Sequence, residues 1–432
     1  MKHITFIILT VIALTANAQA DTTQFMRQLM NLPGISNVKA LKSTRFSEKY
    51  VMTIRQNVDG DTPDKGTFQQ RIFVGLKGTD RPTVIVTEGY EASYGLREGY
   101  EPELCNLFNA NVILCEYRYF DESTPTPCNY DYLTVENSLR DLHHVRTTFD
   151  KVFPGKWMAT GASKGGQTTM FYRVFYPEDV DVSVPYVAPL NKAVEDGRHE
   201  KFIKNVPGTK ADRKTVRKLQ MEMMKRKEQM MPLFQQYCKE RNYQFYQPIE
   251  DIYDYTVFEY SFAHWQYGTP TSSIPSKSAS DKELLEFFMS VSGPDYFSHP
   301  NHYLPFDVQA ARELGYYGYD LKPFRKYASV TDTHSYLYKI MLTPETRNIS
   351  FDPALYDRTV RFLQQNDPTM LFIYGEYDPW SASGVCEWLD TSTKQNLRVY
   401  VQPKGDHGSS IRTLPAELRD DIMQRINNAI TQ

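Results

Sequence analysis

Three side chains of the sequence could together perform nucleophilic catalysis, although they lie far apart along the chain. Ser163 lies in the stretch Gly-Ala-Ser-Lys-Gly-Gly, Asp378 in Glu-Tyr-Asp-Pro-Trp and His407 in Asp-His-Gly. A serine hydroxyl is a poor nucleophile until a neighbouring base takes its proton, and histidine is a common base. A carboxylate that holds the imidazole completes the set. These residue types predict acyl transfer through a covalent intermediate on the serine, provided that the fold brings the three together.

The surroundings of Ser163 support this interpretation. Residues 155–163 have the pattern of a buried strand, and residues 165–177 have the pattern of a helix. Glycine two positions before and two positions after the serine allows a sharp strand-to-helix turn, which is the nucleophile elbow of α/β hydrolases. The alternative is a tight turn of the same shape that performs no chemistry.

Asp378 and His407 have the positions that such an enzyme requires. Each follows a predicted strand, and the order Ser, Asp, His along the chain is that of the α/β-hydrolase triad. Glu376 and Asp406 are nearby alternatives for the acid, but the proline after Asp378 fixes its turn. We therefore predict Ser163 as the nucleophile, His407 as the base and Asp378 as the acid.

The loop that ends the strand at residues 81–89 is expected to complete the site. Backbone N–H groups of Gly89 or Tyr90 would join that of Lys164 in an oxyanion hole. The same loop carries Glu88 and Glu91. An acid beside an acyl-transfer centre is useful when it meets a cation, such as the free α-amino group of a peptide. The alternative is a solvated or locally paired glutamate.

Short, β-branched and nearly continuous apolar runs predict strands that are covered on both faces of a parallel sheet. They alternate with helical patterns up to about residue 190, as right-handed crossovers require. Between 191 and 335 the pattern is helical, and the strands then return. We predict an α/β-hydrolase sheet domain, residues 21–190 and 336–432, interrupted by a mostly helical cap, residues 191–335. The predicted strands are residues 69–76, 81–89, 110–118, 155–163, 180–190, 369–375 and 397–403.

The first twenty residues are typical of an export signal. Lys2 precedes an apolar run, and small residues with A-x-A spacing follow it. The run is too short to span a bilayer core of ~30 Å. The alternative is a buried N-terminal helix. We expect residues 1–20 to be removed and the mature chain to be periplasmic or extracellular, without membrane insertion.

Composition narrows the range of partners and cofactors. The chain has 49 Lys+Arg and 52 Asp+Glu, a formal net charge of -3, so we expect no nucleic acid partner. None of the five cysteines has C-x-x-C spacing, although Cys105, Cys115 and Cys128 could supply one bridge. His299 and His302 lack a third metal ligand. With no Walker A or dinucleotide motif, we expect neither a metal nor a cofactor.

Four segments carry a resemblance to a known family. They are residues 161–166 (Gly-Ala-Ser-Lys-Gly-Gly), 376–380 (Glu-Tyr-Asp-Pro-Trp), 406–408 (Asp-His-Gly) and 112–120 (Val-Ile-Leu-Cys-Glu-Tyr-Arg-Tyr-Phe). The mature chain resembles the secreted bacterial tripeptidyl aminopeptidases over essentially its whole length. It is more distantly similar to lysosomal Pro-Xaa carboxypeptidase and its dipeptidyl-peptidase relative. Tyr117 stands where the distant relatives have histidine, and Lys164 where they have tyrosine, so their substrate preferences do not transfer.

The resemblance implies a secreted serine exopeptidase that releases tripeptides or dipeptides from the free N-terminus of peptide substrates. Ser163 would form an acyl-enzyme that water then hydrolyses. The α-amino group needs an acidic partner, and a cap closes one end of the site. The candidates for substrate binding are Glu88, Glu91 and Glu116 for the amine, with Tyr260 and Trp265 for apolar pockets in the cap.

Three other functions stay open on the sequence. A carboxypeptidase that cleaves after proline would need a basic anchor, for which Arg118 is the candidate, although it could equally form a structural ion pair. An esterase or lipase of the same fold would use the triad without an acidic anchor. A secreted binding protein would keep the triad as a relic. The oligomeric state is not indicated.

Overall fold

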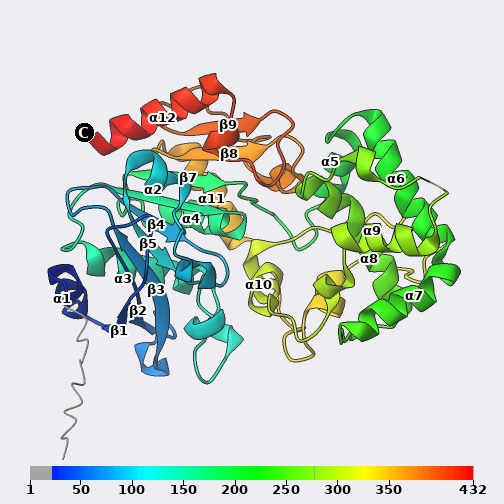
Figure 1. Ribbon diagram of the computed structural model, residues 1–432, viewed down its shortest axis with the longest axis horizontal. Coiled ribbons are helices and arrows are strands. Elements are labelled where there is room, and N and C mark those ends of the chain that lie inside the picture. Colours follow the sequence, from blue (N-terminus) through cyan, green and yellow to red (C-terminus); the bar gives the residue numbers. More distant parts are fainter. Residues whose placement is uncertain (1–21, 277, 432) are drawn as a thin grey trace, which may run out of the picture.

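The computed structural model describes residues 22–276 and 278–431, so the predicted export signal lies outside the described residues. One sheet of nine strands forms the centre of the larger part of the molecule (Figure 1). Its strand order is β1-β2-β3-β5-β4-β6-β7-β8-β9, antiparallel from β1 to β5 in that order and parallel from β5 onwards. The strands are β1 (Ile35–Ala40), β2 (Glu48–Asn57), β3 (Thr67–Leu76), β4 (Thr83–Thr87), β5 (Asn111–Cys115), β6 (Trp157–Ala162), β7 (Val182–Tyr186), β8 (Leu371–Gly375) and β9 (Arg398–Gln402).

The central strands are apolar along their length because both faces of the sheet are covered. In β4, Ile85 packs into one cluster of buried side chains, whereas Val84 and Val86 pack into another on the opposite face. Successive side chains of a strand point to opposite faces, so a strand buried on both sides needs a continuous apolar run. This is why the sequence pattern predicts these strands.

Helices cover the two faces. Apolar side chains of α1 (Gln24–Met30), α3 (Val135–Phe149), α4 (Lys164–Phe175) and α11 (Ala354–Gln365) join the cluster that contains Ile85. Those of α2 (Glu103–Phe108) and α12 (Ala416–Thr431) join the cluster on the other face. Parallel strands joined by helices on both faces define the predicted α/β-hydrolase sheet domain. The fold class is therefore confirmed.

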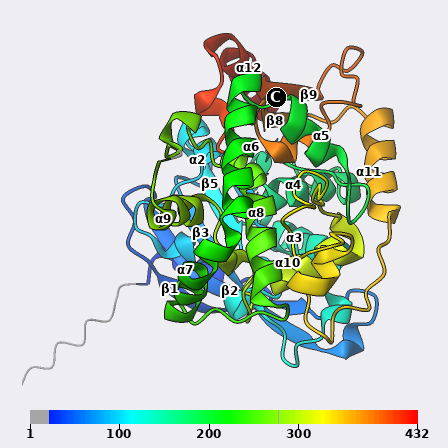
Figure 2. The same cartoon turned by 90° about the vertical axis from the view of Figure 1, so that its right-hand side faces the viewer.

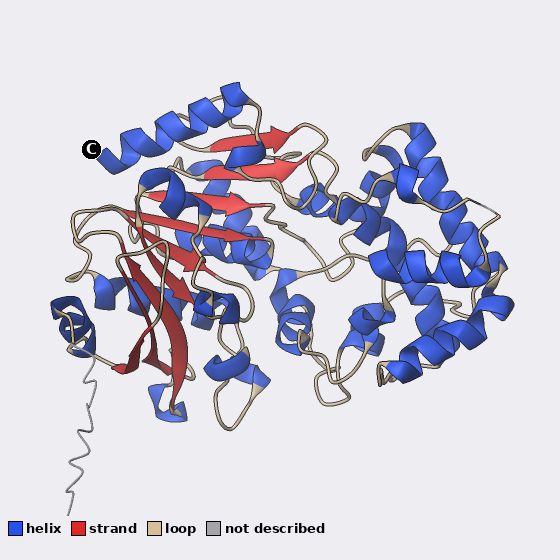
Figure 3. Cartoon of the chain, viewed as in Figure 1, coloured by secondary structure: helices blue, strands red, loops and turns tan. Residues whose placement is uncertain are grey.

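Between β7 and β8 the chain forms a helical region, which lies beside the sheet in Figure 1 and in front of it in Figure 2. Figure 3 shows the strands gathered in one part of the molecule and this helical region in the other. In its long central helix the 14 consecutive residues from Ile252 to Trp265, out of 18, are buried, so the helix is enclosed on all sides. The helices are α5 (Arg198–Asn205), α6 (Lys210–Lys225), α7 (Lys227–Glu240), α8 (Ile249–Gln266), α9 (Asp281–Val291) and α10 (Leu304–Gln309).

No helix within residues 22–276 and 278–431 is long and apolar enough to cross a bilayer. All five cysteines are free thiols. Cys105 and Cys115 are buried in clusters on opposite faces of the sheet, and Cys128 is exposed. The possible bridge among these three is not formed, because the sheet separates Cys105 from Cys115, and Cys128 is exposed whereas the other two are buried.

Candidate active site

Ser163 lies at a strained turn between the end of β6 and the first residue of α4. Its backbone has φ 56° and ψ −122°, a conformation that residues other than glycine rarely adopt. A Cβ atom at Gly161 would collide with the carbonyl oxygen of Gly165, so only glycine allows the chain to turn back this closely. The turn places the serine side chain at the edge of the sheet, as the glycine spacing predicts.

Asp378 and His407 are in contact. Oδ2 of Asp378 lies 2.7 Å from Nδ1 of His407, and Oδ1 accepts a hydrogen bond of 3.1 Å from the backbone N–H of Trp380. The aspartate side chain is fully buried. Its carboxylate can only accept from the ring, so a neutral imidazole carries its proton on Nδ1 and has a lone pair on Nε2. Nε2 is therefore the nitrogen that could act as a base.

Ser163 and His407 line one cavity of about 700 Å³ between the sheet and the helical region. Nε2 of His407 is buried and has no hydrogen-bond partner among the described residues, so no bond joins it to the serine hydroxyl in this conformation. Catalytic hydrogen bonds are often long in ligand-free sites and shorten when substrate binds. The structure thus brings the three predicted residues to one place and leaves the proton-accepting nitrogen unused.

Lys164 lies behind the turn rather than in open solvent. Nζ donates a hydrogen bond of 2.7 Å to the carbonyl oxygen of Gly89 and lies 3.3 Å from the ring centroid of Tyr117. Burial lowers the pKa of this amine well below its ordinary value, against the opposing effect of Glu88. As the first residue of α4, Lys164 has a backbone N–H without an acceptor inside the helix, which suits the predicted oxyanion contact.

The two other predicted oxyanion donors are occupied. The backbone N–H groups of Gly89 and Tyr90 donate to Oε2 of Glu88 at 3.0 and 3.4 Å, and Tyr94 donates to Oε1 at 2.5 Å. Burial raises the pKa of Glu88, although these hydrogen bonds oppose the shift. The expectation for Gly89 and Tyr90 is therefore not met in this conformation, because a local carboxylate already takes both protons.

The three glutamates predicted for amine binding have different positions. Glu88 and Glu91 line the cavity, where Glu91 accepts a hydrogen bond of 2.6 Å from the backbone of Ser93. Glu116 does not line it: this carboxylate is fully buried and forms an ion pair with Arg71. The prediction for Glu116 is corrected, since protein groups use its charge.

The two predicted aromatic residues also do not line the cavity. Tyr260 is fully buried and stacks on Phe288, with the ring centroids 4.3 Å apart. Trp265 packs edge-on to Tyr377, with centroids 6.2 Å apart. Both belong to the core of the helical region, which corrects the expectation that they bind substrate. In a helix that is buried on all sides, large aromatic rings mainly pack in the core.

Three further acids, Glu259, Asp295 and Asp307, line the cavity, and the sequence pattern does not single them out. Glu259 projects from the middle of α8, and Asp307 lies in α10. Asp307 is buried and accepts a hydrogen bond of 2.6 Å from Asn301. The sequence signal that could have identified Glu259 is its place within a run of aromatic residues, where a charged side chain has no obvious structural role. The acids that line the cavity are Glu88, Glu91, Glu259, Asp295 and Asp307.

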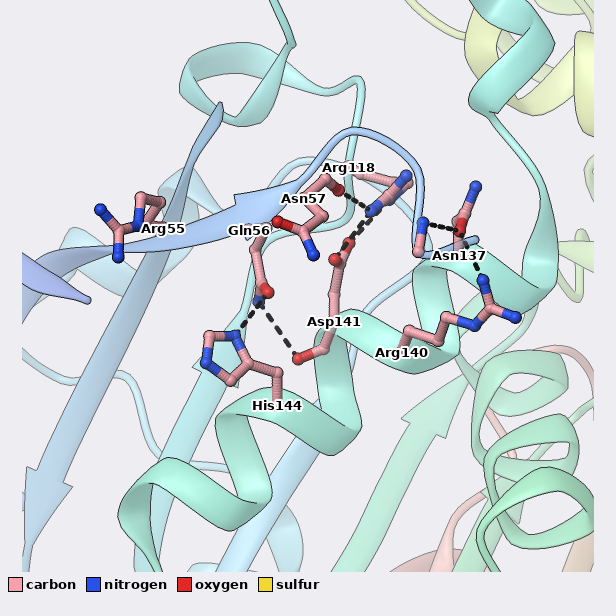
Figure 4. A pocket seen from close by; sticks show the side chains of 9 residues that line it. Arg55, Gln56, Asn57, Arg118, Asn137, Arg140, Asp141 and His144 are labelled. Carbon is pink, nitrogen blue, oxygen red and sulfur yellow. Dashed lines mark hydrogen bonds and ion pairs between the residues drawn. The ribbon is translucent and has the colours of Figure 1, made fainter. Parts of the chain in front are cut away.

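Arg118 lies elsewhere, beside a separate cavity of about 400 Å³ (Figure 4). Its guanidinium makes bonds of 2.7 and 2.8 Å to the two carboxylate oxygens of Asp141. It also donates to the carbonyl oxygens of Asn57 and Val58. The side chain is 1% exposed and fastens the loop after β5 to α3 and to the end of β2. Arg118 is thus a structural ion pair, not a carboxylate anchor in the cavity of Ser163.

The alternatives to Asp378 as the acid, and the histidine considered as a metal ligand, form hydrogen bonds within the protein. Glu376 accepts a hydrogen bond from the backbone of Lys404, and Asp406 accepts one from Gly408. Nε2 of His299 lies 2.8 Å from the carbonyl oxygen of Ile340. None of these contacts involves the ring of His407.

The cavity lies where α/β hydrolases perform their chemistry, beyond the carboxyl ends of the parallel strands. The chain belongs to the family described as PS-10 peptidase S37, whose model matches residues 18–430. It is therefore a serine peptidase.

Two curated relatives and one solved structure illustrate the similarity. The chain is 31% identical to the prolyl tri/tetrapeptidyl aminopeptidase of Streptomyces mobaraensis, over 94% of this chain and 84% of that protein. It is 27% identical to the lysosomal Pro-X carboxypeptidase of Mus musculus, over 37% of each. The proline iminopeptidase of Mycobacterium smegmatis aligns in structure with a TM-score of 0.41 and 11% identity, over 91% of this chain and 99% of that chain.

Proposed function

We propose that this peptidase is an exported aminopeptidase that releases tripeptides or dipeptides from the free N-terminus of peptides. Ser163 is the nucleophile, His407 the base and Asp378 the acid. The family, the similarity to a prolyl tri/tetrapeptidyl aminopeptidase and the contact between Asp378 and His407 support this assignment. Export rests on the signal pattern of residues 1–20.

The reaction follows from the positions of the three side chains. Nε2 of His407 takes the hydroxyl proton while Oγ of Ser163 attacks the scissile carbonyl, and Asp378 stabilises the imidazolium that forms. The backbone N–H of Lys164 donates to the developing oxyanion. The imidazolium then protonates the leaving amine, which departs as the shortened peptide. Water, deprotonated by His407, hydrolyses the acyl-enzyme and frees the N-terminal fragment.

The observation that carries the proposal is the composition of the cavity wall, in which acids outnumber bases. Five acids line it, whereas Lys164 is its one lysine or arginine among the described residues, and that amine is already bonded to Gly89. Such a cavity complements the ammonium group of a peptide N-terminus rather than the carboxylate of a C-terminus. It is also more acidic than the binding of a neutral ester requires. These features favour an aminopeptidase over a carboxypeptidase or a lipase.

The helical region supplies the closed end that an exopeptidase needs. We propose residues 191–335 as a cap, because side chains from α8 and from the residues around α10 line the same cavity as Ser163. Three extended residues span at most about 10–11 Å. The distance between the amine site and the serine hydroxyl therefore fixes the length of the released fragment.

Mass spectrometry of the products tests the proposal. The protein is incubated with a mixture of synthetic peptides that have either free or acetylated N-termini, with Ser163→Ala as the control. We expect tripeptides or dipeptides from the free N-termini, little product from the acetylated set and none from the variant. Release from C-termini, or equal cleavage of both sets, would contradict it. Edman sequencing of the exported protein tests removal of residues 1–20.

A further inference from the structure

Glu259 is a buried acid that the triad does not use. It lies in the middle of α8, is 8% exposed, and borders the cavity that contains Ser163 and His407. A buried carboxylate is costly unless a cation or several hydrogen bonds compensate for the lost water. No described lysine, arginine or histidine forms an ion pair with it, so hydrogen bonds or a ligand in the cavity must compensate for the lost water.

The hydrogen bonds of Glu259 leave one oxygen unused. The hydroxyl groups of Tyr317 and Tyr319 donate to Oε2 at 2.9 and 2.8 Å. No residue within the described ranges donates to Oε1. Two donors on one oxygen fix the carboxylate in place, while the other oxygen can accept from a ligand. Among the described residues, six phenols interact electrostatically with Glu259: Tyr267, Tyr296, Tyr316, Tyr317, Tyr319 and Tyr336.

Aromatic rings connect this carboxylate to the catalytic side chains. The ring of Tyr317 lies 4.5 Å from that of Tyr316 and 5.4 Å from that of Trp380, centroid to centroid. Trp380 lies 6.5 Å from the ring of His407. Tyr316, Tyr317 and Trp380 also line the cavity. Aromatic faces attract an ammonium ion, so this wall suits a cationic group held by Glu259.

The other acids of the cavity are less suited to the same task. Both oxygens of Glu88 accept hydrogen bonds from its own loop. Glu91 is held by Ser93. Burial raises the pKa of Asp307 well above its ordinary value with only Asn301 to oppose it, which favours a neutral carboxyl. Burial raises the pKa of Glu259 to about 7, so an approaching cation can keep it ionised.

We propose that Glu259 binds the α-amino group of the peptide substrate, with Oε1 accepting from the ammonium and the rings of Tyr316 and Tyr317 beside it. This assignment rests on the proposed aminopeptidase function and names the residue that recognises the free N-terminus. Glu259 would then set the register of the peptide relative to Ser163.

The test compares Glu259→Gln with Glu250→Gln, an exposed glutamate on the same helix. Each protein is assayed with a tripeptidyl anilide that ends in proline, either with a free amine or acetylated, and with a fluorophosphonate that labels the serine. We expect Glu259→Gln to lose on the order of 10²-fold in kcat/KM for the free-amine substrate, mainly through KM. The fluorophosphonate should label Glu259→Gln at the same rate as the unmodified protein. Glu250→Gln should match the unmodified protein in both kcat/KM and labelling rate.

The outcomes separate the two proposals. Equal cleavage of the free and acetylated substrates by the unmodified protein overturns the aminopeptidase function itself. A preference for the free amine that Glu259→Gln retains overturns the role of Glu259 alone. Loss of that preference in Asp307→Asn, with Glu259→Gln unaffected, transfers the role to Asp307.

A second variant covers the case in which Glu259→Gln does not take up the fluorophosphonate because it fails to fold. Tyr319→Phe keeps the ring and removes one of the two donors to Glu259. It should raise KM for the free-amine substrate at pH 7 several-fold and leave the acetylated substrate unaffected. An unchanged KM at pH 7 would then contradict the role of Glu259.

Discussion

At the scale of single residues, the bond between Asp378 and Nδ1 of His407 determines where the imidazole keeps its proton. In Asp378→Asn the amide can donate to Nδ1, which moves the proton to Nε2 and removes the base. We expect a loss of about 10⁴-fold in kcat with KM little changed, measured by steady-state kinetics. Thermal unfolding serves as the control for folding. A variant that keeps more than a tenth of the activity would exclude this arrangement.

Glu259 should also lower the free energy of unfolding of the substrate-free protein, by an amount that depends on pH. Burial raises its pKa from 4.5 to about 7. Below pH 4.5 the folded and unfolded states both hold the proton and no cost arises. The cost grows as pH rises to 7 and is then constant at about 3 kcal/mol. Glu259→Gln should therefore unfold at a higher temperature than the unmodified protein at pH 8, but not at pH 4.5.

Differential scanning calorimetry at the two pH values measures this effect, with Glu250→Gln as the matched control because that side chain is exposed. A variant that binds substrate less tightly yet unfolds at a higher temperature has lost a functional group, not a structural one. Equal destabilisation by Glu259→Gln at both pH values would mean that the carboxylate serves the fold.

At the scale of elements, the turn between β6 and α4 depends on glycine. A Cβ atom at Gly161 would collide with the carbonyl oxygen of Gly165 and approach that of Thr87 to 2.8 Å, whereas at Gly99 only one atom lies within 4 Å. We expect Gly161→Ala to lose about 1–3 kcal/mol in unfolding free energy and most of its activity. Gly99→Ala should stay within about 0.5 kcal/mol. Urea denaturation and kcat/KM measure both, and similar behaviour of the two variants would refute the steric argument.

The same elements explain what the sequence could predict. Strands β3 to β9 are each expected from an apolar run, and the turn at Ser163 from its glycines. Burial on both faces restricts the residue types of the central strands, and a sharp turn restricts those around the serine. β1 and β2 were missed. β1 is an edge strand without a buried residue, and in β2 the buried Tyr50, Met52 and Ile54 alternate with more exposed residues. Such a half-buried pattern is weak.

The substrate-binding residues could not be predicted for a different reason. α8 is buried all round, so its sequence has no periodic face that would separate Glu259, at the cavity, from Tyr260, in the core. Which acid meets the cavity depends on how the helix is rotated against the sheet domain. That rotation is set by contacts between distant segments, and neighbouring residues do not reveal it.

At the scale of the whole molecule, α8 joins the helical region to the catalytic loop. Its last residue, Gln266, accepts a hydrogen bond of 3.1 Å from the backbone N–H of His407, and Glu259 lies two turns earlier. One rigid helix thus supports the loop of the base and carries the proposed amine site. Because the two are fixed relative to each other, the helix couples substrate register to catalysis.

The charges of the assembled cavity predict a narrow pH range for activity. Binding requires an ionised Glu259, which burial places above about pH 7, and a protonated substrate amine, whose ordinary pKa is about 7.7–8.0. The phenols that face Glu259 have pKa values raised by burial and stay neutral there. The ratio of kcat/KM for the free-amine anilide to that for the acetylated anilide should therefore peak between pH 7 and 8 and fall on both sides. Protonation of the triad affects both substrates equally, so it cancels in this ratio. Tyr319→Phe should move the acidic limb to higher pH, and a ratio that stays flat from pH 6 to 9 would rule out recognition of the amine by a buried carboxylate.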